Sequence, residues 1–251
     1  MVSSLKCDVI DEIYRTGQVM TAAGRVPALS IVVREFAEAL YGVIRRESPE
    51  LVLEVGMAYG VTTAAIAHAL RDNGRGRVIS VDPYQTTQWQ SGGLTTLDLT
   101  GLSDLHELRE EPDFVALPAL LKEGRTFGVA YIDGLHNLEY ALLDFFYVDR
   151  MLAVSGVVGF NDCDWPTVMP TLRFVQHYRR YEEILVGLPA LYGTRNAVTR
   201  KIAQSADRLV PGRITRSRIL GPMIGRRRED RYFRKIEKWE PQEGFYWPIA
   251  R

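Results

Sequence analysis

The chain has 251 residues, of which 46% are hydrophobic and 25% charged, as in one α/β domain with additions. Its 31 basic and 31 acidic residues balance, and Cys7 and Cys163 lie too far apart for a metal-type spacing or a disulfide framework. Neither a signal peptide nor an apolar run of about 18 residues is evident, so we expect a cytoplasmic protein that does not enter a membrane.

The predicted elements begin with helices and continue as alternating strands and helices. Residues 5–46 carry apolar side chains at helical spacing, which predicts a helical N-terminal cap over 1–48. Strands are then predicted over 50–55, 77–81, 106–110, 128–132 and 156–160, and helices over 61–71, 114–122, 138–152 and 167–178. Further strands over 182–188 and 196–201 complete a domain over 49–202. This alternation predicts a mostly parallel sheet with helices on both faces.

Charge is divided unevenly along the chain. Residues 1–194 hold 16 basic and 25 acidic side chains, whereas residues 195–251 hold 15 basic and 6 acidic ones. We therefore predict a basic C-terminal extension over 203–251. It either docks on acidic surface of its own domain or a sister subunit, or binds nucleic acid, anionic lipid or a phosphate-bearing substrate.

The first predicted strand leads into a glycine turn, Gly56 to Gly60, that opens a helix. Such a turn lets a ligand approach the backbone closely at a helix N-terminus. Its G-x-x-x-G spacing, with Glu54 two residues earlier, differs from the G-x-G-x-x-G of dinucleotide-binding folds. The next strand ends in Asp82, which can accept both ribose hydroxyls of a nucleoside. The sequence therefore predicts a cofactor that contains adenosine.

Polar side chains also follow the later strands. Asp113 and Phe114, after the third strand, could hold an adenine ring. Asp133, Asn161 and Asp162 offer hard oxygen ligands from adjacent strand ends, which suit Mg²⁺, Ca²⁺ or Mn²⁺. A bound ion would lower the pKa of a substrate hydroxyl, and the nearby His136 imidazole could take its proton. Each residue also has a purely structural interpretation, as a helix cap, a turn residue or a hydrogen-bonded histidine.

Four motifs in order, E-x-G-x-x-x-G, V-D-P, Y-I-D-G-x-H and F-N-D-x-D-W-P, resemble those of class I S-adenosylmethionine-dependent methyltransferases. Over roughly residues 25–190 the chain is most similar to bacterial small-molecule O-methyltransferases of the catechol- and macrocin-methyltransferase types. The resemblance implies a Rossmann-like α/β sheet of about seven strands with the last one antiparallel, and a homo-oligomer.

The resemblance also implies a role for each motif residue. The methionine part of S-adenosyl-L-methionine would be held by the turn and the helix below it, that is by Glu54, Gly56, Tyr59, Gly60, Thr62 and Thr63. Asp82 would hold the ribose, and Asp113 and Phe114 the adenine. Asp133 would border the cofactor and, with Asn161 and Asp162, hold a divalent metal, most readily Mg²⁺. His136 falls where the catechol type carries its base. The Asn-Asp order at 161–162 and Leu135, where an acidic residue is common, depart from the pattern.

The expected activity is transfer of a methyl group to a hydroxyl of a sugar or of a glycosylated or hydroxylated natural product, with Asp133 and His136 as catalytic residues. Three alternatives stay open. The protein could bind adenosylmethionine without catalysis or without metal. The basic tail would also fit methylation of RNA or protein. An NAD-dependent oxidoreductase is permitted by the turn and Asp82 but disfavoured by the missing G-x-G-x-x-G.

Overall fold

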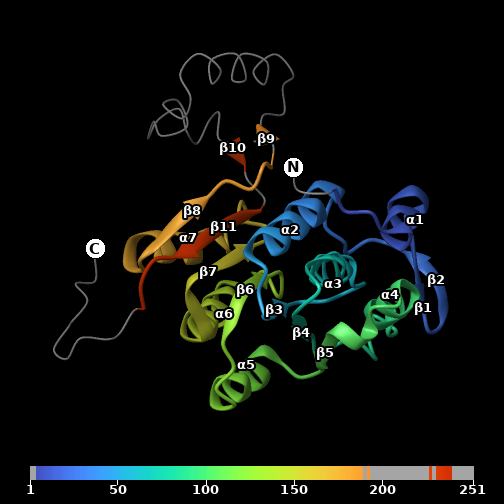
Figure 1. Ribbon diagram of the computed structural model, residues 1–251, viewed down its shortest axis with the longest axis horizontal. Coiled ribbons are helices and arrows are strands. Elements are labelled where there is room, and N and C mark those ends of the chain that lie inside the picture. The colour runs from blue at the N-terminus through green and yellow to red at the C-terminus, as the bar shows by residue number, and fades with distance from the viewer. Residues whose placement is uncertain (1–3, 189–190, 193–225, 228–229, 239–251) are drawn as a thin grey trace.

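A seven-stranded sheet forms the centre of the computed structural model, which describes residues 4–188, 191–192, 226–227 and 230–238 (Figure 1). The strand order is β5-β4-β3-β6-β7-β11-β8. The strands are β3 (Leu51–Val55), β4 (Arg77–Val81), β5 (His106–Arg109), β6 (Phe127–Ile132), β7 (Leu152–Phe160), β8 (Tyr181–Ile184) and β11 (Arg231–Lys235). Strands β3 to β7 pair in parallel, and β11 is antiparallel to both of its neighbours. The predicted α/β, Rossmann-like sheet with an antiparallel last strand is confirmed.

Helices cover both faces of the sheet because successive strand residues point to opposite sides. Val52 joins the core formed with α1 (Asp8–Thr16), α2 (Arg34–Glu47) and α3 (Val61–Asn73). Its neighbour Leu53 joins the core formed with α5 (Asp113–Lys122), α6 (Leu138–Met151) and α7 (Met169–Tyr178). This arrangement leaves the carboxyl edge of the parallel strands as the place where loops can form a site.

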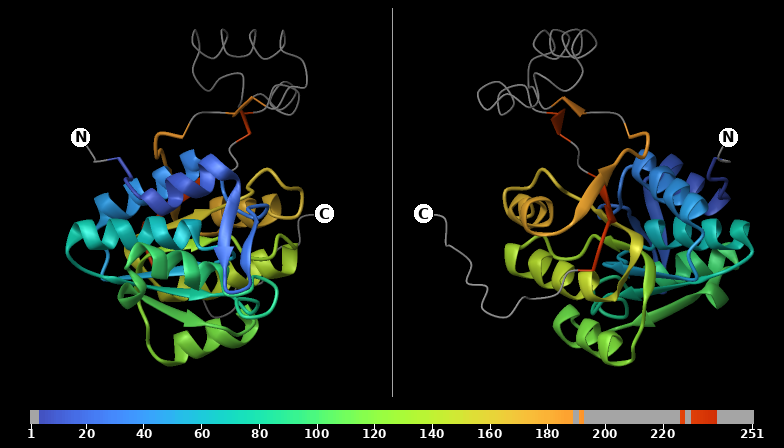
Figure 2. Two further views of the ribbon diagram at one scale, coloured as in Figure 1. Left: turned by 90° about the vertical axis from the view of Figure 1, so that its right-hand side faces the viewer. Right: turned by 60° about the vertical axis from the view of Figure 1, so that its left-hand side comes forward.

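The N-terminal prediction of a continuous helical region is wrong over residues 18–27. There the chain forms a hairpin of β1 (Gln18–Thr21) and β2 (Gly24–Pro27), drawn in blue in Figure 2. Gly17 ends α1 with a φ of 65°, a conformation that favours glycine. Side chains of β1 then alternate between exposed and buried, and the Thr21 hydroxyl donates a hydrogen bond to Gly24 O at 2.8 Å across the turn. Burial in β1 therefore alternates with a period of two, as in a strand, and does not follow the helical spacing expected from the sequence.

Other boundaries shift by a few residues. Strand β7 starts at Leu152 rather than 156, and its pairing with β6 is irregular between the pairs Phe127–Leu152 and Val129–Val157. Strand β8 ends at Ile184, short of the predicted 188. The helix α4 (Gly92–Thr100) and the 3₁₀ turn η1 (Ser103–Leu105) were also not predicted. Among the described residues no helix has the length and apolar character that crossing a membrane requires.

The antiparallel strand of the sheet comes from the predicted basic extension. The expected strand over 196–201 lies outside the described residues, and β11 lies between β7 and β8, beside the orange β8 in the right-hand view of Figure 2. Arg231 pairs with Glu183 at 2.7 Å, and Arg234 pairs with Glu47 of α2 at 2.8 Å. This part of the basic region therefore docks on acidic residues of its own domain. The arginines over 213–218 lie outside the described residues, and the domain boundaries at 48 and 202 stay predictions.

Candidate active site

The glycine turn after β3 packs against the end of β6. Gly56 has a φ of 88°, and a Cβ atom built on it would lie 2.1 Å from the backbone oxygen of Asp133. Gly60 has a φ of 74°, and its Cβ would lie 2.8 Å from the Cα of Gly93. Both positions therefore require glycine for their conformation and for close backbone contact. The turn predicted to bind a cofactor is thus joined directly to the strand end predicted to bind a metal.

Asp82 organises this turn from the end of β4. Its Oδ2 accepts hydrogen bonds from Met57 N at 3.1 Å and Ala58 N at 2.8 Å, and its Oδ1 accepts one from Tyr84 N at 2.9 Å. The side chain is only 3% exposed but borders the cavity described below. A carboxylate that already holds the turn retains lone pairs for further hydrogen bonds. Its contact with a ribose stays a prediction.

Glu54 lies beneath the turn rather than in the cavity. It is fully buried, and its Oε2 accepts hydrogen bonds from the Thr63 and Ser80 hydroxyls, each at 2.6 Å. Burial raises the pKa of Glu54 to about 7. These contacts give Glu54 and Thr63 a supporting place under the turn. Thr62, in contrast, borders a small hollow between the turn and residues 30–32 of the N-terminal segment.

A cavity of about 310 Å³ opens at the carboxyl ends of β3, β4 and β6, a volume typical of ligand sites. Phe114 stands at its side with 53% of its surface exposed, while Asp113 is 6% exposed. Tyr59 does not border this cavity, but its ring packs edge-on against Trp89 with centroids 5.2 Å apart. The lining residues are Gly56, Ala58, Val81, Asp82, Pro83, Tyr84, Gln88, Trp89, Pro112, Asp113, Phe114, Asp133, Gly134, Leu135 and Tyr140.

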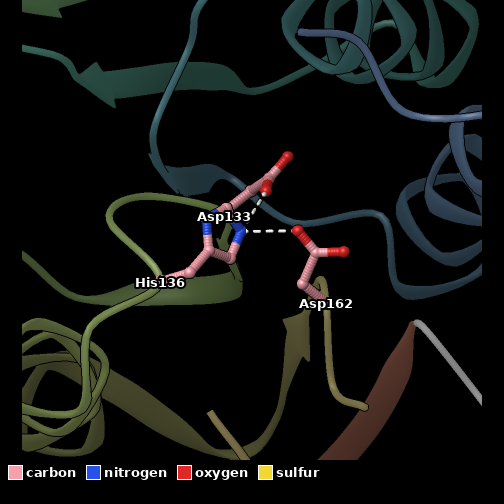
Figure 3. Close-up of side chains that lie close together, drawn as sticks. All are labelled: Asp133, His136 and Asp162. Carbon is pink, nitrogen blue, oxygen red and sulfur yellow. Dashed lines mark ion pairs between the residues drawn. The ribbon is translucent and has the colours of Figure 1, made fainter. Parts of the chain in front are cut away.

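Asp133, which lines this cavity, lies close to His136 and Asp162, and the imidazole lies between the two carboxylates (Figure 3). His136 Nε2 is 2.7 Å from Asp162 Oδ2 and 3.6 Å from Asp133 Oδ1. Asp133 and His136 come from the loop after β6, and Asp162 follows β7 with a φ of 49°. Trp165 packs on His136 with ring centroids 4.9 Å apart. Sequence reasoning therefore selected three residues that the fold brings together.

The charges of this cluster shift each other's pKa. Contact with Asp133 and with Asp162 raises the pKa of His136 to about 9. Burial, together with the nearby charge of Asp162, raises the pKa of Asp133 to about 6, although His136 acts in the opposite direction. At neutral pH the imidazole of this arrangement is protonated, and it holds two carboxylates that would otherwise repel each other.

The side chain of Asn161, the third predicted metal ligand, is hydrogen-bonded to the buried Asp230. Its side-chain nitrogen donates a hydrogen bond to Asp230 Oδ1 at 2.7 Å, and Asp230 Oδ2 accepts one from the Tyr131 hydroxyl at 3.0 Å. Burial raises the pKa of Asp230 to about 8. Asp230 directly precedes β11 and was missed by sequence reasoning, because nothing local to a basic segment indicates a partner about seventy residues earlier.

The donor set of the cluster fits a divalent cation. One ligand atom from each of Asp133, His136 and Asp162 can be chosen so that all three lie within 4.8 Å of one another. Carboxylate oxygens are the donors that Mg²⁺ and Ca²⁺ prefer, and an imidazole is also accepted by Mn²⁺ or Zn²⁺. A cation would relieve the repulsion that helps to raise the pKa of Asp133.

Comparisons of the sequence and the structure with known proteins find similarity to methyltransferases. Residues 53–163 match the family model of a methyltransferase domain. No curated protein matches the chain. Similar solved structures include an O-methyltransferase from Bacillus cereus in complex with SAH, at 17% identity and a TM-score of 0.58, over 73% of this chain and 85% of that one.

Two further structures match at similar levels. The O-methyltransferase TomG of Streptomyces achromogenes, involved in tomaymycin synthesis and solved with SAM, has 16% identity and a TM-score of 0.57, over 73% and 84% of the two chains. The SAH-bound methyltransferase PaMTH1 of Podospora anserina has 15% identity and a TM-score of 0.59, over 75% and 86%. At such identities the likeness establishes the fold. Residues 53–163 thus match a methyltransferase domain, and the chain has the fold of O-methyltransferases that bind S-adenosylmethionine or S-adenosylhomocysteine.

Proposed function

We propose that the protein transfers the methyl group of S-adenosyl-L-methionine to a hydroxyl of a small molecule, a sugar or a hydroxylated or glycosylated natural product. The observation that carries this proposal is the cluster of Asp133, His136 and Asp162 beside the cavity. Deprotonation of a hydroxyl requires a base beside the cofactor, which His136 can supply, and the two carboxylates can hold a divalent ion there. The O-methyltransferases of similar fold, one of them involved in tomaymycin synthesis, support this choice of acceptor.

The cofactor would lie along the carboxyl edge of the sheet. Its adenine would reach Asp113 and Phe114, its ribose Asp82, and its methionine part the Gly56–Gly60 turn and Thr62. Asp133 borders both the cavity and the hollow over the turn, so the sulfonium would lie near it. This orientation would direct the methyl group toward His136.

In the proposed reaction a lone pair of the substrate oxygen attacks the methyl carbon in line with the carbon–sulfur bond. The bond to sulfur breaks, its electron pair stays on sulfur, and S-adenosylhomocysteine is left. His136 Nε2 takes the hydroxyl proton, which contributes about 10²–10⁴-fold to the rate. Positioning of the two reactants and exclusion of water supply the rest.

His136 can act as a base only when it has lost its own proton. The carboxylates that raise its pKa to about 9 would have to be neutralised first. Asp133 and Asp162 would hold a divalent ion, with Asn161 contributing its amide oxygen, and such an ion also lowers the pKa of a substrate hydroxyl. Because the Asn161 nitrogen is bound to Asp230 and only its neutral oxygen is left for an ion, a methyltransferase that works without metal is the second candidate.

Further parts of the proposal concern partners and location. A homo-oligomer is expected from the resemblance to small-molecule O-methyltransferases. The two free, buried cysteines suit the cytoplasm. Contact with nucleic acid is not favoured, because Arg231 and Arg234 of the basic region pair with Glu183 and Glu47.

The test is a turnover assay with adenosylmethionine and a panel of sugars, catechols and other hydroxylated compounds, read by mass spectrometry as methylated product and adenosylhomocysteine. Changing His136 to Ala is expected to reduce the rate by about 10²–10⁴-fold while cofactor binding persists. His177→Ala, at an exposed histidine on α7, is the matched control.

Each outcome of this assay has a separate meaning. Equal turnover of the His136→Ala variant and the wild type at every pH would remove the base role. Full activity in EDTA would select the metal-independent candidate. Binding of adenosylhomocysteine without turnover of any hydroxyl compound would overturn the acceptor class and leave a non-catalytic or differently directed protein.

A further inference from the structure

The carboxyl of Asp144 lies close to Asp113, on the side of the cavity where we place adenine, and the proposed function gives it no role. Asp144, inside α6, is fully buried, and neither of its oxygens accepts a hydrogen bond from a described N–H or O–H group. A Cβ built on Gly134 would lie 3.6 Å from Asp144 Oδ2 and 3.7 Å from Asp113 Oδ2. Since Gly134 and Asp113 both line the cavity, the two carboxyls meet at its wall.

Two carboxyls in such a place cannot both be ionised. Burial and the charge of Asp113 raise the pKa of Asp144 well above its ordinary value. Burial likewise raises the pKa of Asp113 to about 6, with the charge of Asp82 acting in the same direction. No arginine or lysine in the described part of the chain offsets these effects. One proton shared between the two carboxyls satisfies both, as in other carboxyl pairs.

The position of each carboxyl decides which one carries the proton. Asp113 is the first residue of α5, where the helix dipole and the free backbone N–H groups favour a negative charge. Asp144 lies in the interior of α6 and has no such stabilisation. The proton therefore resides on Asp144, and Asp113 remains a carboxylate that can accept further hydrogen bonds.

We propose that Asp144 is a positioning residue for the cofactor: its carboxylic O–H donates to Asp113 and fixes the Asp113 carboxylate so that it accepts the exocyclic N–H of adenine. The inference rests on the proposed function, because that function places adenine at Asp113. It assigns to α6 a part in cofactor recognition without any contact between Asp144 and the cofactor.

Cofactor affinity should then depend on the shared proton. When rising pH removes it, Asp113 and Asp144 repel each other, and Asp82, directly after β4, adds a third negative charge near the pair. The fixed acceptor is lost, so the dissociation constant of the cofactor rises with pH. An asparagine at position 144 would donate the same hydrogen bond through an amide that does not titrate.

The experiment measures the dissociation constant of S-adenosylhomocysteine by isothermal titration calorimetry from about pH 6 to about pH 10, a range that spans the expected titration of the pair. The proteins compared are the wild type, Asp144→Asn, Asp144→Leu, and Glu139→Gln as a control that removes an exposed carboxylate from the same helix. At each pH the dissociation constant of the wild type is divided by that of the variant. The ratio is independent of the titration of the ligand's own groups, because both proteins bind the same ligand. Thermal unfolding of each protein checks that it is folded.

The account predicts that Asp144→Asn binds like the wild type at low pH and more tightly than it at high pH. Asp144→Leu should bind about tenfold more weakly at neutral pH, because a hydrogen bond to a charged group is lost. Glu139→Gln should follow the wild type throughout. A wild-type to Asp144→Asn ratio that stays constant with pH would overturn the inference. If the folded wild type bound no adenosylhomocysteine at any pH, the proposed function would fail and the inference with it.

Discussion

The two ends of the candidate site are built in different ways. At the cofactor end, backbone N–H groups of Met57, Ala58 and Tyr84 already bind the Asp82 carboxylate. At the acceptor end, charged side chains on two loops face each other, and only a protonated His136 separates their carboxylates. The cofactor end is therefore preformed by the chain, whereas the acceptor end carries charge that a cation or a substrate is expected to rearrange.

The two ends meet where the backbone at the end of β3 contacts the backbone at the end of β6. Asp133 N donates a hydrogen bond to Val55 O at 2.8 Å, and the Cα of Gly56 lies against the Asp133 carbonyl. In the proposed reaction the direction of methyl transfer would thus depend on Gly56, a position without a side chain. Substitutions that disturb both ends should therefore have the largest effects. Those that disturb one end should have smaller effects, and those that remove a single ligand from one end the smallest.

The largest effect is expected from Gly56→Ala. A Cβ would lie 2.1 Å from Asp133 O on a backbone with a φ of 88°, so both ends must shift. We expect about 2–4 kcal/mol of lost stability from strain and overpacking, with adenosylhomocysteine binding and turnover both impaired. Denaturant unfolding and calorimetry measure this.

Gly74→Ala is the matched control for Gly56→Ala. Gly74 has a φ of 70° but no heavy atom within 4 Å of a built Cβ, so it reports the cost of conformation alone, about 1–2 kcal/mol. An equal loss of stability in Gly56→Ala and Gly74→Ala would show that the contact between Gly56 and Asp133 contributes nothing to stability.

Asp82→Asn should affect the cofactor end alone. In the wild type, backbone N–H groups of the turn donate to the Asp82 carboxylate. The asparagine amide is neutral and has only one oxygen to accept them, so the turn loses charge-assisted hydrogen bonds. A loss of about 10–100-fold in adenosylhomocysteine affinity is expected, with cation binding at Asp133 and Asp162 unchanged. Unchanged cofactor affinity would contradict the role given to Asp82.

The pKa of His136 should report the acceptor end alone. Because the folded-state pKa, about 9, exceeds the ordinary value, protonated His136 stabilises the metal-free fold fully below about pH 6.5. This contribution is lost as pH rises through about 9. Asp162→Asn should move the pKa down toward its ordinary value in an NMR titration, whereas a pKa that did not move would remove Asp162 as its cause.

The smallest effect is expected from Asn161→Ala. Its side-chain nitrogen is bound to Asp230, so the residue contributes at most one neutral oxygen to a cation. We expect cation affinity to fall by less than about tenfold, and Asp162→Ala to lower it further because a charged ligand is lost. Titration calorimetry with Mg²⁺ and Mn²⁺ measures both. A larger loss of cation affinity in Asn161→Ala than in Asp162→Ala would contradict the prediction that Asp162 is the stronger ligand.

The sequence predicted the cofactor end and the sheet because their signals are local. Strand, turn and helix follow one another between Leu51 and Leu70, and G-x-x-x-G with Asp82 indicates the ligand class. Asp133, His136 and Asp162 were also found, because parallel strands bring their carboxyl ends to one edge. Their short distances could not be predicted, since loop conformation sets them.

Residues that act through a distant partner were missed. Asp230 reaches Asn161 only because β11 enters the sheet beside β7, although a strand was expected over 196–201. Asp144 lies among the buried residues of α6, and only the packing of α5 on α6 reveals its contact with Asp113. The hairpin over 18–27 was missed because four-residue strands carry too little pattern to outweigh helical spacing.

The most direct test of the central claim is a crystal structure of the protein with adenosylhomocysteine and Mn²⁺, with anomalous scattering used to locate the ion. The account predicts adenine beside Asp113 and Phe114, the ligand's sulfur near Asp133, and an anomalous peak between Asp133 and Asp162. A ligand bound outside this cavity, or one with its sulfur turned away from His136, would contradict the account.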